Sequence, residues 1–231
     1  MENARRSVWE RSWLARSTAL QDLLCRVLSV GVALLAIVAC APLLIGIAIL
    51  VRLTSEGPIV YSQIRVGVNR RRRPSASSTG RRRVDHGGKL FRIYKFRTMY
   101  VGSDHGVETW AKPDDPRVTP VGRWLRRTRL DELPQLFNVL KGDMNIVGPR
   151  PEQPGIFGVL RDRIERYGDR QRVLPGMTGL AQIHQSYDVD LENVRQKLKY
   201  DLEYIERRTV LEDIRIMLGT IPVVFLRRGG W

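Results

Sequence analysis

The sequence has 231 residues, which is enough for one domain with a hydrophobic core and an additional segment, and too few for two domains of ordinary size. Its composition, 43% hydrophobic and 27% charged, is typical of a folded protein, and its two cysteines do not suggest a disulfide framework. A formal net charge of +15 indicates an anionic partner: nucleic acid, an anionic membrane surface or a phosphorylated substrate.

Residues 30–51 form an uncharged, apolar run of 22 residues, "VGVALLAIVACAPLLIGIAILV", between Arg26 and Arg52. A helix needs roughly 20 such residues to cross the hydrocarbon layer. Pro42 lies past the middle of the run, where it bends or breaks a helix. Because arginines lie on both flanks, the positive-inside rule keeps both flanks in the cytoplasm. We therefore expect a re-entrant membrane helix, with a straight single-pass anchor as the alternative.

The position of the apolar run divides the sequence into three predicted segments: a basic N-terminal tail at 1–25, the membrane helix at 26–53 and a cytoplasmic domain at 54–231. Within the domain, the Arg- and Ser-rich residues 69–87 are predicted to be a disordered-like basic insertion. The absence of aromatic residues among these arginines favours a solvated loop on anionic lipid over a nucleic-acid arm.

The expected fold class is α/β, mainly helical with a small sheet. A short strand is predicted at Ile59–Tyr61 and a second one at Lys89–Met99, where "KLFRIYKFRTM" alternates aromatic and basic residues. A helix is predicted after Thr119, which can act as its N-cap, with Pro120 at its first position.

Two further helices are predicted at Asp190–Glu206 and Thr209–Leu226 from periodic apolar residues. The second helix carries an apolar stripe that is predicted either to join the core or to lie on a membrane. The stripe consists of Leu211, Ile214, Met217, Leu218 and Ile221.

The segment "TRLDELPQLFNVLKGDMNIVGPRPE" combines an amphipathic helical pattern with polar residues at both ends. The apolar spacing predicts a helix that stops at Gly142, with Asp131 at or next to its N-cap and Glu132 and Pro134 in its first turn. One interpretation is that Asp131 is only a cap and Glu132 an acid favoured by the helix dipole.

Nearby basic residues favour a second interpretation, a phosphoryl-transfer site. Four arginines precede the acids within two turns, and a helix N-terminus binds anions. Arg150 lies between two prolines in "GPRP", which hold it rigidly as a fork for phosphate. In such a site one acid can be a covalent nucleophile and a second acid can hold Mg²⁺.

At these residues the chain resembles the bacterial sugar transferase family, the monotopic polyprenyl-phosphate phosphoglycosyl transferases. The resemblance covers roughly Arg26 to Arg228 in order. It is carried by the proline-broken apolar segment and by "SEGPIVYSQIRVG", "GGKLFRIYKFRTM", "DDPRVTPVGRWLRRTRLDELPQLFNVLKGDMNIVGPRPE", "LPGMTGLAQ", "YDLEYIE" and "LEDIRIMLGT".

The resemblance implies transfer of a phosphosugar from a nucleotide sugar, usually a UDP-sugar, to polyprenyl (undecaprenyl) phosphate, with release of UMP. Such a reaction begins exopolysaccharide, O-antigen or related glycan assembly. The implied partners are the nucleotide sugar, polyprenyl phosphate and anionic membrane lipid, with no nucleic acid expected. The implied location is the bacterial inner membrane, with the catalytic domain on its cytoplasmic face.

The same resemblance implies roles for particular residues. Asp131 is expected to attack the β-phosphorus and form a covalent phosphosugar-enzyme, and Glu132 is expected to be catalytic and to bind the Mg²⁺ cofactor. The residues expected to bind substrate or phosphate are Lys95, Arg97, Arg117, Arg150 and Asp201.

Several features depart from the family pattern: Ser29 replaces a common acid, Ala41 a common serine before the breaking proline, and "QIHQS", with His184, the commoner Asn-Gly. Two other functions stay open at this point. The first is a membrane-bound phosphohydrolase that uses the same aspartate with water as the acceptor. The second is a basic membrane adaptor without enzymatic activity, which binds nucleic acid or lipid through residues 70–83.

Overall fold

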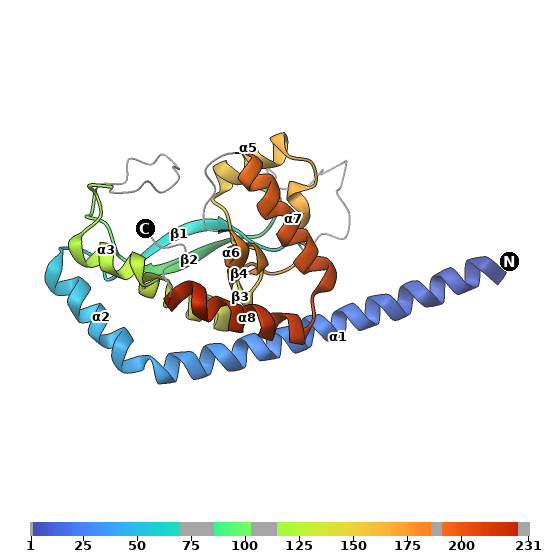
Figure 1. Ribbon diagram of the computed structural model, residues 1–231, viewed down its shortest axis with the longest axis horizontal. Coiled ribbons are helices and arrows are strands. Elements are labelled where there is room, and N and C mark those ends of the chain that lie inside the picture. The colour runs from blue at the N-terminus through green and yellow to red at the C-terminus, as the bar shows by residue number, and fades with distance from the viewer. Residues whose placement is uncertain (1, 70–85, 103–114, 186–190, 226–231) are drawn as a thin grey trace.

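The computed structural model describes residues 2–69, 86–102, 115–185 and 191–225, with side chains described from residue 19 to residue 223 of these ranges. These residues form mostly helices, together with two small two-stranded sheets (Figure 1). The expected mainly helical class with a small sheet is therefore confirmed. The helices are α1 (Glu2–Ala39), α2 (Ala41–Thr54), α3 (Pro120–Arg127), α4 (Gln135–Lys141), α5 (Pro154–Arg163), α6 (Leu180–His184), α7 (Leu191–Arg207) and α8 (Val210–Phe225), with 3-10 turns η1 (Leu130–Glu132) and η2 (Tyr167–Arg172).

The apolar run forms two helices, because α1 ends and α2 begins on either side of Cys40, which has φ −93° and ψ 4°. Pro42 lies in the first turn of α2, where its missing N–H costs little, whereas a continuous helix would need that N–H to bond Val38. The chain therefore bends two residues before Pro42, and α2 turns away from the axis of α1 (Figure 1). The N-terminal part of α1, within the segment predicted to be a tail, extends past the rest of the molecule.

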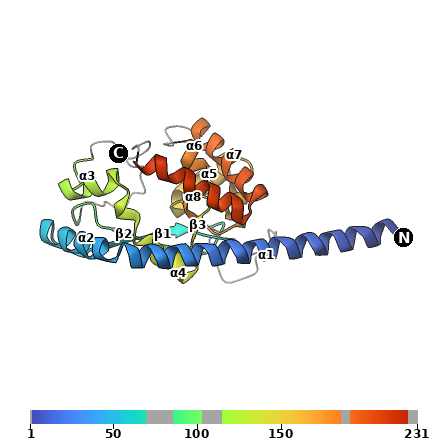
Figure 2. The same ribbon diagram turned by 60° about the horizontal axis from the view of Figure 1, so that its bottom comes forward.

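Both helices bury one face against the remaining elements and expose an apolar face on the other side. Ala33 of α1 and Ile47 and Val51 of α2 are buried, and the stretch Ala19–Ala39 is long and apolar enough to cross a membrane. Figure 2 shows both helices along one side of the molecule. The exposed apolar residues are Leu20, Leu23, Leu24, Val27, Leu34, Leu35 and Val38 of α1, and Leu43, Ile45, Ile49, Leu50 and Leu53 of α2.

The larger sheet pairs β1 (Val60–Val66) with β2 (Leu90–Phe96) in antiparallel register. Both predicted strands are found, but β1 continues past the predicted end at Tyr61 to Val66, over residues in which polar and apolar side chains alternate. The second sheet pairs β3 (Asn145–Val147) with β4 (Gly176–Thr178) in parallel, and neither of these strands is predicted by the sequence pattern.

The predicted helix at the acid pair is divided in two by Pro134. Because Pro134 has no N–H to bond the Leu130 carbonyl, Leu133 N–H donates to that carbonyl at 3.3 Å and closes a 3-10 turn. Asp131 therefore lies on η1, and Pro134 itself is the N-cap of α4, so the predicted cap position of Asp131 is wrong. The predicted stop at Gly142 is confirmed, with φ 84°.

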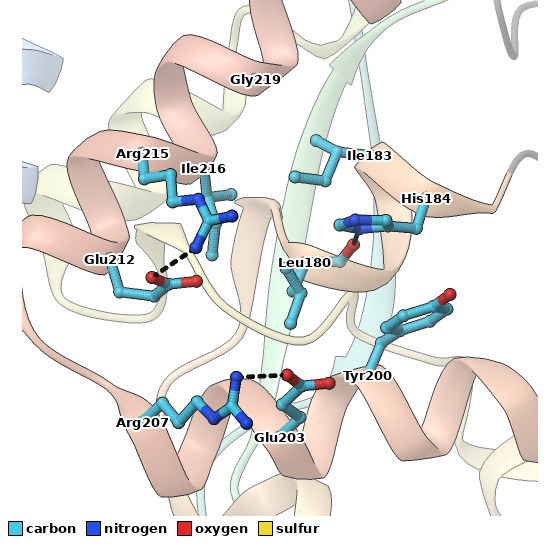
Figure 3. A pocket seen from close by; sticks show the side chains of 10 residues that line it. All are labelled: Leu180, Ile183, His184, Tyr200, Glu203, Arg207, Glu212, Arg215, Ile216 and Gly219. Carbon is cyan, nitrogen blue, oxygen red and sulfur yellow. Dashed lines mark hydrogen bonds and ion pairs between the residues drawn. The ribbon is translucent and has the colours of Figure 1, made fainter.

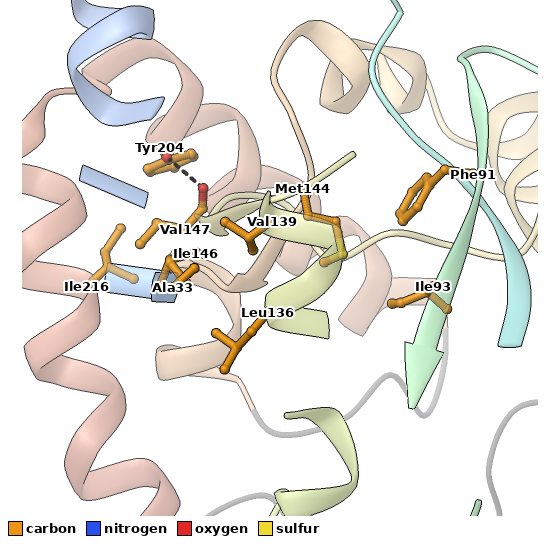
Figure 4. Close-up of a cluster of buried hydrophobic side chains, with 10 residues drawn as sticks. All are labelled: Ala33, Phe91, Ile93, Leu136, Val139, Met144, Ile146, Val147, Tyr204 and Ile216. Atoms are coloured by element: carbon orange, nitrogen blue, oxygen red, sulfur yellow. Dashed lines mark hydrogen bonds between the residues drawn. The ribbon is translucent and has the colours of Figure 1, made fainter. Parts of the chain in front are cut away.

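The largest core cluster combines α1, β2, α4, β3, α7 and α8 (Figure 4). Val139 of α4, Met144 and Ile216 of α8 are fully buried in it, and the Tyr204 hydroxyl donates to the Val147 carbonyl at 3.2 Å. A separate cluster packs Ile47 and Val51 of α2 against Phe96 and Leu125. The hydrophobic helices α1 and α2 are therefore part of the same cores as the elements that follow them.

The predicted N-cap of Thr119 is confirmed, since its hydroxyl accepts from Gly122 N–H at 2.9 Å. The two C-terminal helices are found as α7 and α8. Of the apolar stripe on α8, Met217 packs against the core cluster. Its four other members, Leu211, Ile214, Leu218 and Ile221, are exposed.

Candidate active site

The acid pair on η1 contacts two cations from distant parts of the chain. Lys95 Nζ, from β2, lies 2.7 Å from Glu132 Oε1 and 3.7 Å from Asp131 Oδ2. Arg150, from the turn after β3, donates through Nη2 to Glu132 Oε1 at 2.6 Å, and its Nη1 lies 3.4 Å from Oε2. Asp131 is only 6% exposed. The structure thus brings four predicted site residues together in one cluster of two acids and two cations, in which the acids are more deeply buried than the cations.

The two acids have pKa values that are shifted in opposite directions. Burial raises the pKa of Asp131, and the attraction of Lys95 does not cancel this rise. Burial acts in the same direction on Glu132, but Arg150 and Lys95 outweigh it and hold the pKa of Glu132 well below its usual range. Neighbouring acids with pKa values pushed apart perform different tasks. Of the two acids, Asp131 is therefore the weaker and Glu132 the stronger.

The turn that carries Arg150 depends on glycines that let two backbone segments approach closely. A Cβ on Gly148 would lie 2.4 Å from the Leu174 carbonyl oxygen. Gly148 N–H donates to the Thr178 carbonyl at 2.9 Å, and Gly176 N–H donates to the Pro149 carbonyl at 3.0 Å. The parallel pairing of β3 and β4 therefore continues into the turn and fixes its backbone.

A network of buried charged side chains contacts the backbone of this turn. Arg170 Nη2 donates to the Arg150 carbonyl at 3.0 Å, and its Nε pairs with Asp201 Oδ2 at 2.7 Å. Glu152 pairs with Lys197 at 3.0 Å and with Arg170 at 3.5 Å. Asp201 is 2% exposed and pairs with Arg170, so this predicted site residue is separated from the acid pair by two residues, Arg170 and Arg150. Arg170, Glu152 and Lys197 are not predicted by the sequence.

Asn138 is a further residue that the sequence analysis missed. It is fully buried on α4, where its Oδ1 accepts from Tyr94 N–H at 3.0 Å and its Nδ2 donates to the Arg92 carbonyl at 2.7 Å. These bonds hold α4, which follows the acids, against β2, which carries Lys95. The available signal was an asparagine, a poor helix former, inside an otherwise apolar helical pattern.

Arg97 and Arg117, which were also predicted to bind substrate or phosphate, form hydrogen bonds with residues outside the acid pair. Arg97 Nη2 donates to the Ser55 carbonyl at 2.6 Å and to Ser55 Oγ at 2.8 Å, and so fastens β2 to the C-terminal end of α2. Arg117 forms a fork with Asp115, with Nη2 to Oδ2 at 2.6 Å. Hydrogen bonds from Arg117 lower the pKa of Asp115 to about 2.

The donor chemistry of the acid pair fits a magnesium ion. Mg²⁺ prefers hard oxygen ligands and is usually held by one or two carboxylates together with substrate phosphates. Asp131 and Glu132 are adjacent carboxylates of this kind. Within the described ranges no group of three or more His, Cys, Asp or Glu side chains could hold a metal by itself.

His184 lies in a separate hollow of about 320 Å³ between α6, α7 and α8 (Figure 3). Its ring stacks on Tyr200 with centroids 5.0 Å apart, and its Nδ1 lies 2.9 Å from the Leu180 carbonyl oxygen. Ion pairs on the rim join Arg207 to Glu203 and Arg215 to Glu212. These contacts place His184 away from the acid pair, on the wall of this hollow.

Comparison with known proteins identifies the family. The sequence profile described as bacterial sugar transferase matches residues 20–227. The UDP-glucose:undecaprenyl-phosphate glucose-1-phosphate transferase of Caulobacter vibrioides is 38% identical over 203 residues, which cover 87% of this chain and 69% of the relative. The exopolysaccharide production protein ExoY of Sinorhizobium fredii is 35% identical over 225 residues, covering 89% and 87%.

The UDP-N-acetylgalactosamine-undecaprenyl-phosphate N-acetylgalactosaminephosphotransferase of Aeromonas hydrophila is 38% identical over 192 residues, which cover 83% of this chain. The chain spans 41% of the length of this relative. It spans 42% and 35% of the length of two further relatives, from Escherichia coli and Komagataeibacter xylinus. The profile match includes the acid pair, both cations and the supporting network, so the chain belongs to the bacterial sugar transferase family.

Proposed function

We propose that this protein transfers a phosphosugar from a UDP-sugar to undecaprenyl phosphate through a covalent intermediate on Asp131. The observation that carries this proposal is the acid pair itself, in which Lys95 Nζ lies 3.7 Å from Asp131 and 2.7 Å from Glu132, and Arg150 Nη2 lies 2.6 Å from Glu132. The relatives named above as undecaprenyl-phosphate phosphotransferases support the same substrate class. They differ in the sugar, glucose or N-acetylgalactosamine, so the sugar has to be identified with a panel of UDP-sugars.

The proposed reaction has two displacements at phosphorus. In the first, a carboxylate oxygen of Asp131 attacks the β-phosphorus of the UDP-sugar, the bond from that phosphorus to the bridging oxygen breaks, and UMP leaves with the electron pair. In the second, a phosphate oxygen of undecaprenyl phosphate attacks the same phosphorus. The aspartyl bond breaks, which restores the carboxylate and leaves a sugar diphosphate on the lipid.

Lys95 and Arg150 neutralise charge in both displacements. Before substrate binds, both cations contact Glu132. A diphosphate that enters the cluster offers them further acceptors, and the guanidinium of Arg150 matches two phosphate oxygens at once. A magnesium ion held by Glu132 and Asp131 would stabilise the negative charge on the departing UMP.

We further propose that α1 and α2 enter and leave the cytoplasmic leaflet of the bacterial inner membrane from the same side. Contacts with the catalytic domain run along one face of α1 from Arg26 to Ile37. A helix fastened in this way cannot cross the hydrocarbon layer without carrying charged domain surface with it. The exposed apolar face of α8 supports contact with the same leaflet.

This placement can be tested with single cysteines at Ser17 and Glu56 in a protein in which Cys25 and Cys40 are replaced by alanine. A thiol reagent that does not cross membranes should label both positions from the cytoplasmic side of inverted vesicles. Labelling of the two positions from opposite sides would show a straight span instead.

The reaction is tested by intact-mass analysis after exposure to a panel of UDP-sugars. The wild-type protein should gain the mass of a phosphosugar, and Asp131→Asn should not. An equal adduct on both proteins would exclude Asp131 as the nucleophile.

Two alternatives give different outcomes in the same assays. Release of UMP and free sugar phosphate without undecaprenyl phosphate would indicate a phosphohydrolase. Deletion of residues 70–83, which lie outside the described residues, would abolish the function of a basic adaptor, whereas we expect it only to change the transfer rate.

A further inference from the structure

The helix α1 has a polar face in the N-terminal half of the stretch Ala19–Ala39. Asp22, Arg26 and Ser29 follow one another at helical spacing, so their side chains share one side of α1. Asp22 forms an ion pair with Arg208, and Ser29 Oγ accepts from Ile146 N–H at 3.3 Å. All three residues therefore contact the catalytic domain.

Arg26 makes the most extensive of these contacts. Its Nη1 donates to the Met144 carbonyl at 2.7 Å and to Asn145 Oδ1 at 3.2 Å. Its Nη2 donates to the Val139 carbonyl and lies 3.5 Å from the Leu140 carbonyl. The last carbonyls of a helix have no partner within it, and a cation at this end also complements the helix dipole. Arg26 is therefore the side-chain cap at the C-terminal end of α4.

The position of α4 determines the position of the acid pair. Asp131 and Glu132 lie on η1, which Leu133 and Pro134 join to α4, and a helix of the length of α4 is only about 10 Å long. Asn138 fixes the middle of α4 to β2, and Lys95 of β2 contacts both acids. If the contacts of Arg26 are lost, α4 can pivot about Asn138, and the acids then move relative to Lys95.

We propose that Arg26 is a positioning residue for Asp131, through which the membrane helix α1 holds the catalytic carboxylate in line with its substrate. This inference rests on the proposed function. Misplacement of a reacting group by about 1 Å can cost on the order of 100-fold in rate. Substrate binding through Lys95 and Arg150 needs no contact with Arg26, so the effect is expected in the chemical step.

The test compares Arg26→Met and Arg26→Lys with wild type, all reconstituted in vesicles with undecaprenyl phosphate. The exposed Arg163 of α5 provides a matched control, Arg163→Met, with the same loss of charge. We expect kcat and the rate of adduct formation to fall about 10- to 100-fold in Arg26→Met, with KM for the UDP-sugar within about twofold of wild type. Arg26→Lys should recover part of the rate, because an ammonium can bond one or two of the four oxygens. Amide hydrogen exchange over residues 139–145 should become faster in Arg26→Met.

Several results would overturn the proposal. One is a kcat in Arg26→Met within twofold of wild type, and another is an equal loss in Arg163→Met. If Arg26→Met does not fold, a kcat for Arg26→Lys equal to that of wild type would also refute it. If the wild-type protein transfers no phosphosugar, the proposed function fails. The exchange measurement still tests the cap in that case, because unchanged exchange in Arg26→Met shows that Arg26 does not hold α4.

Discussion

Replacement of Arg150 by lysine keeps the positive charge beside Glu132 but removes the planar fork. In the structure the guanidinium of Arg150 reaches both carboxylate oxygens of Glu132, at 2.6 and 3.4 Å. Arg170 donates a hydrogen bond to the backbone carbonyl of Arg150. An ammonium is a point charge that can replace one of these bonds. Arg150→Lys therefore tests whether forked geometry, in addition to charge, is required at this turn.

The expected loss follows from the number of bonds and their exposure. One hydrogen bond to a charged group contributes about 1.5–3 kcal/mol, which corresponds to roughly 10- to 100-fold in kcat/KM. The Arg150 side chain is 32% exposed, so solvent weakens the interaction and we expect a loss near 10-fold. Arg150→Met should lose more kcat/KM, because it removes the ion pair with Glu132 and leaves the ion pair between Glu132 and Lys95. The pKa of Glu132 should then rise.

The assay is initial-rate release of UMP in vesicles that contain undecaprenyl phosphate, together with thermal unfolding of each variant. Arg163→Lys, on the exposed end of α5, is the matched control. The reasoning is refuted if Arg150→Lys retains the wild-type kcat/KM, or if Arg163→Lys loses as much.

Three further predictions concern the network behind the site, the clamp on α4 and the membrane face. Lys197 and Arg170 more than reverse the effect of burial on Glu152 and lower its pKa to about 2, from an ordinary value of 4.5. The resulting stabilisation, on the order of 3 kcal/mol, is complete above about pH 4.5 and is lost as the pH falls toward 2. The difference in unfolding midpoint between wild type and Glu152→Gln should therefore shrink across that window, and a difference that stays constant would contradict this. Asn138→Leu removes two bonds to β2 and should lower stability by about 1–3 kcal/mol and slow adduct formation in a single turnover; an unchanged rate would count against the clamp. Leu218→Glu, at a side chain that is 62% exposed, should weaken binding to anionic vesicles without changing the unfolding midpoint in detergent, whereas undiminished binding would argue against membrane contact by α8.

The elements with a clear periodic pattern or cap could be predicted from the sequence, whereas the short strands β3 and β4 and the helices α5 and α6 were not. The strand β2 and the helices α3, α7 and α8 have a clear pattern or cap, such as Thr119. The strands β3 and β4 have three residues each and pair with one another across a long sequence separation, so no local pattern reveals them. The division of the helix at Pro134 was missed because apolar spacing continues across the proline.

For the candidate site, the sequence identified residue types but not all of their neighbours. Asp131, Glu132 and Arg150 could be predicted from one segment that mixes acids, a proline-flanked arginine and a helical pattern. Lys95 was assigned to the site only through the family resemblance. Its position beside the acids depends on the packing of β2 against α4, which no local pattern reveals. The partnership of Asp201 with Arg170 was not predictable, since nothing in either segment indicates that the two side chains meet in the interior.

The packing of α1 and α2 has a consequence for protein engineering. Ala33 lies in the same core as α4 and β3, and Ile47 and Val51 fill a second core together with Phe96. Removing these helices to obtain a water-soluble enzyme would open both cores and uncap α4. Replacing them with an unrelated transmembrane segment would restore attachment to the bilayer without restoring the core. In this protein the two hydrophobic helices are therefore not an interchangeable module, and solubilisation calls for redesign of their exposed face only.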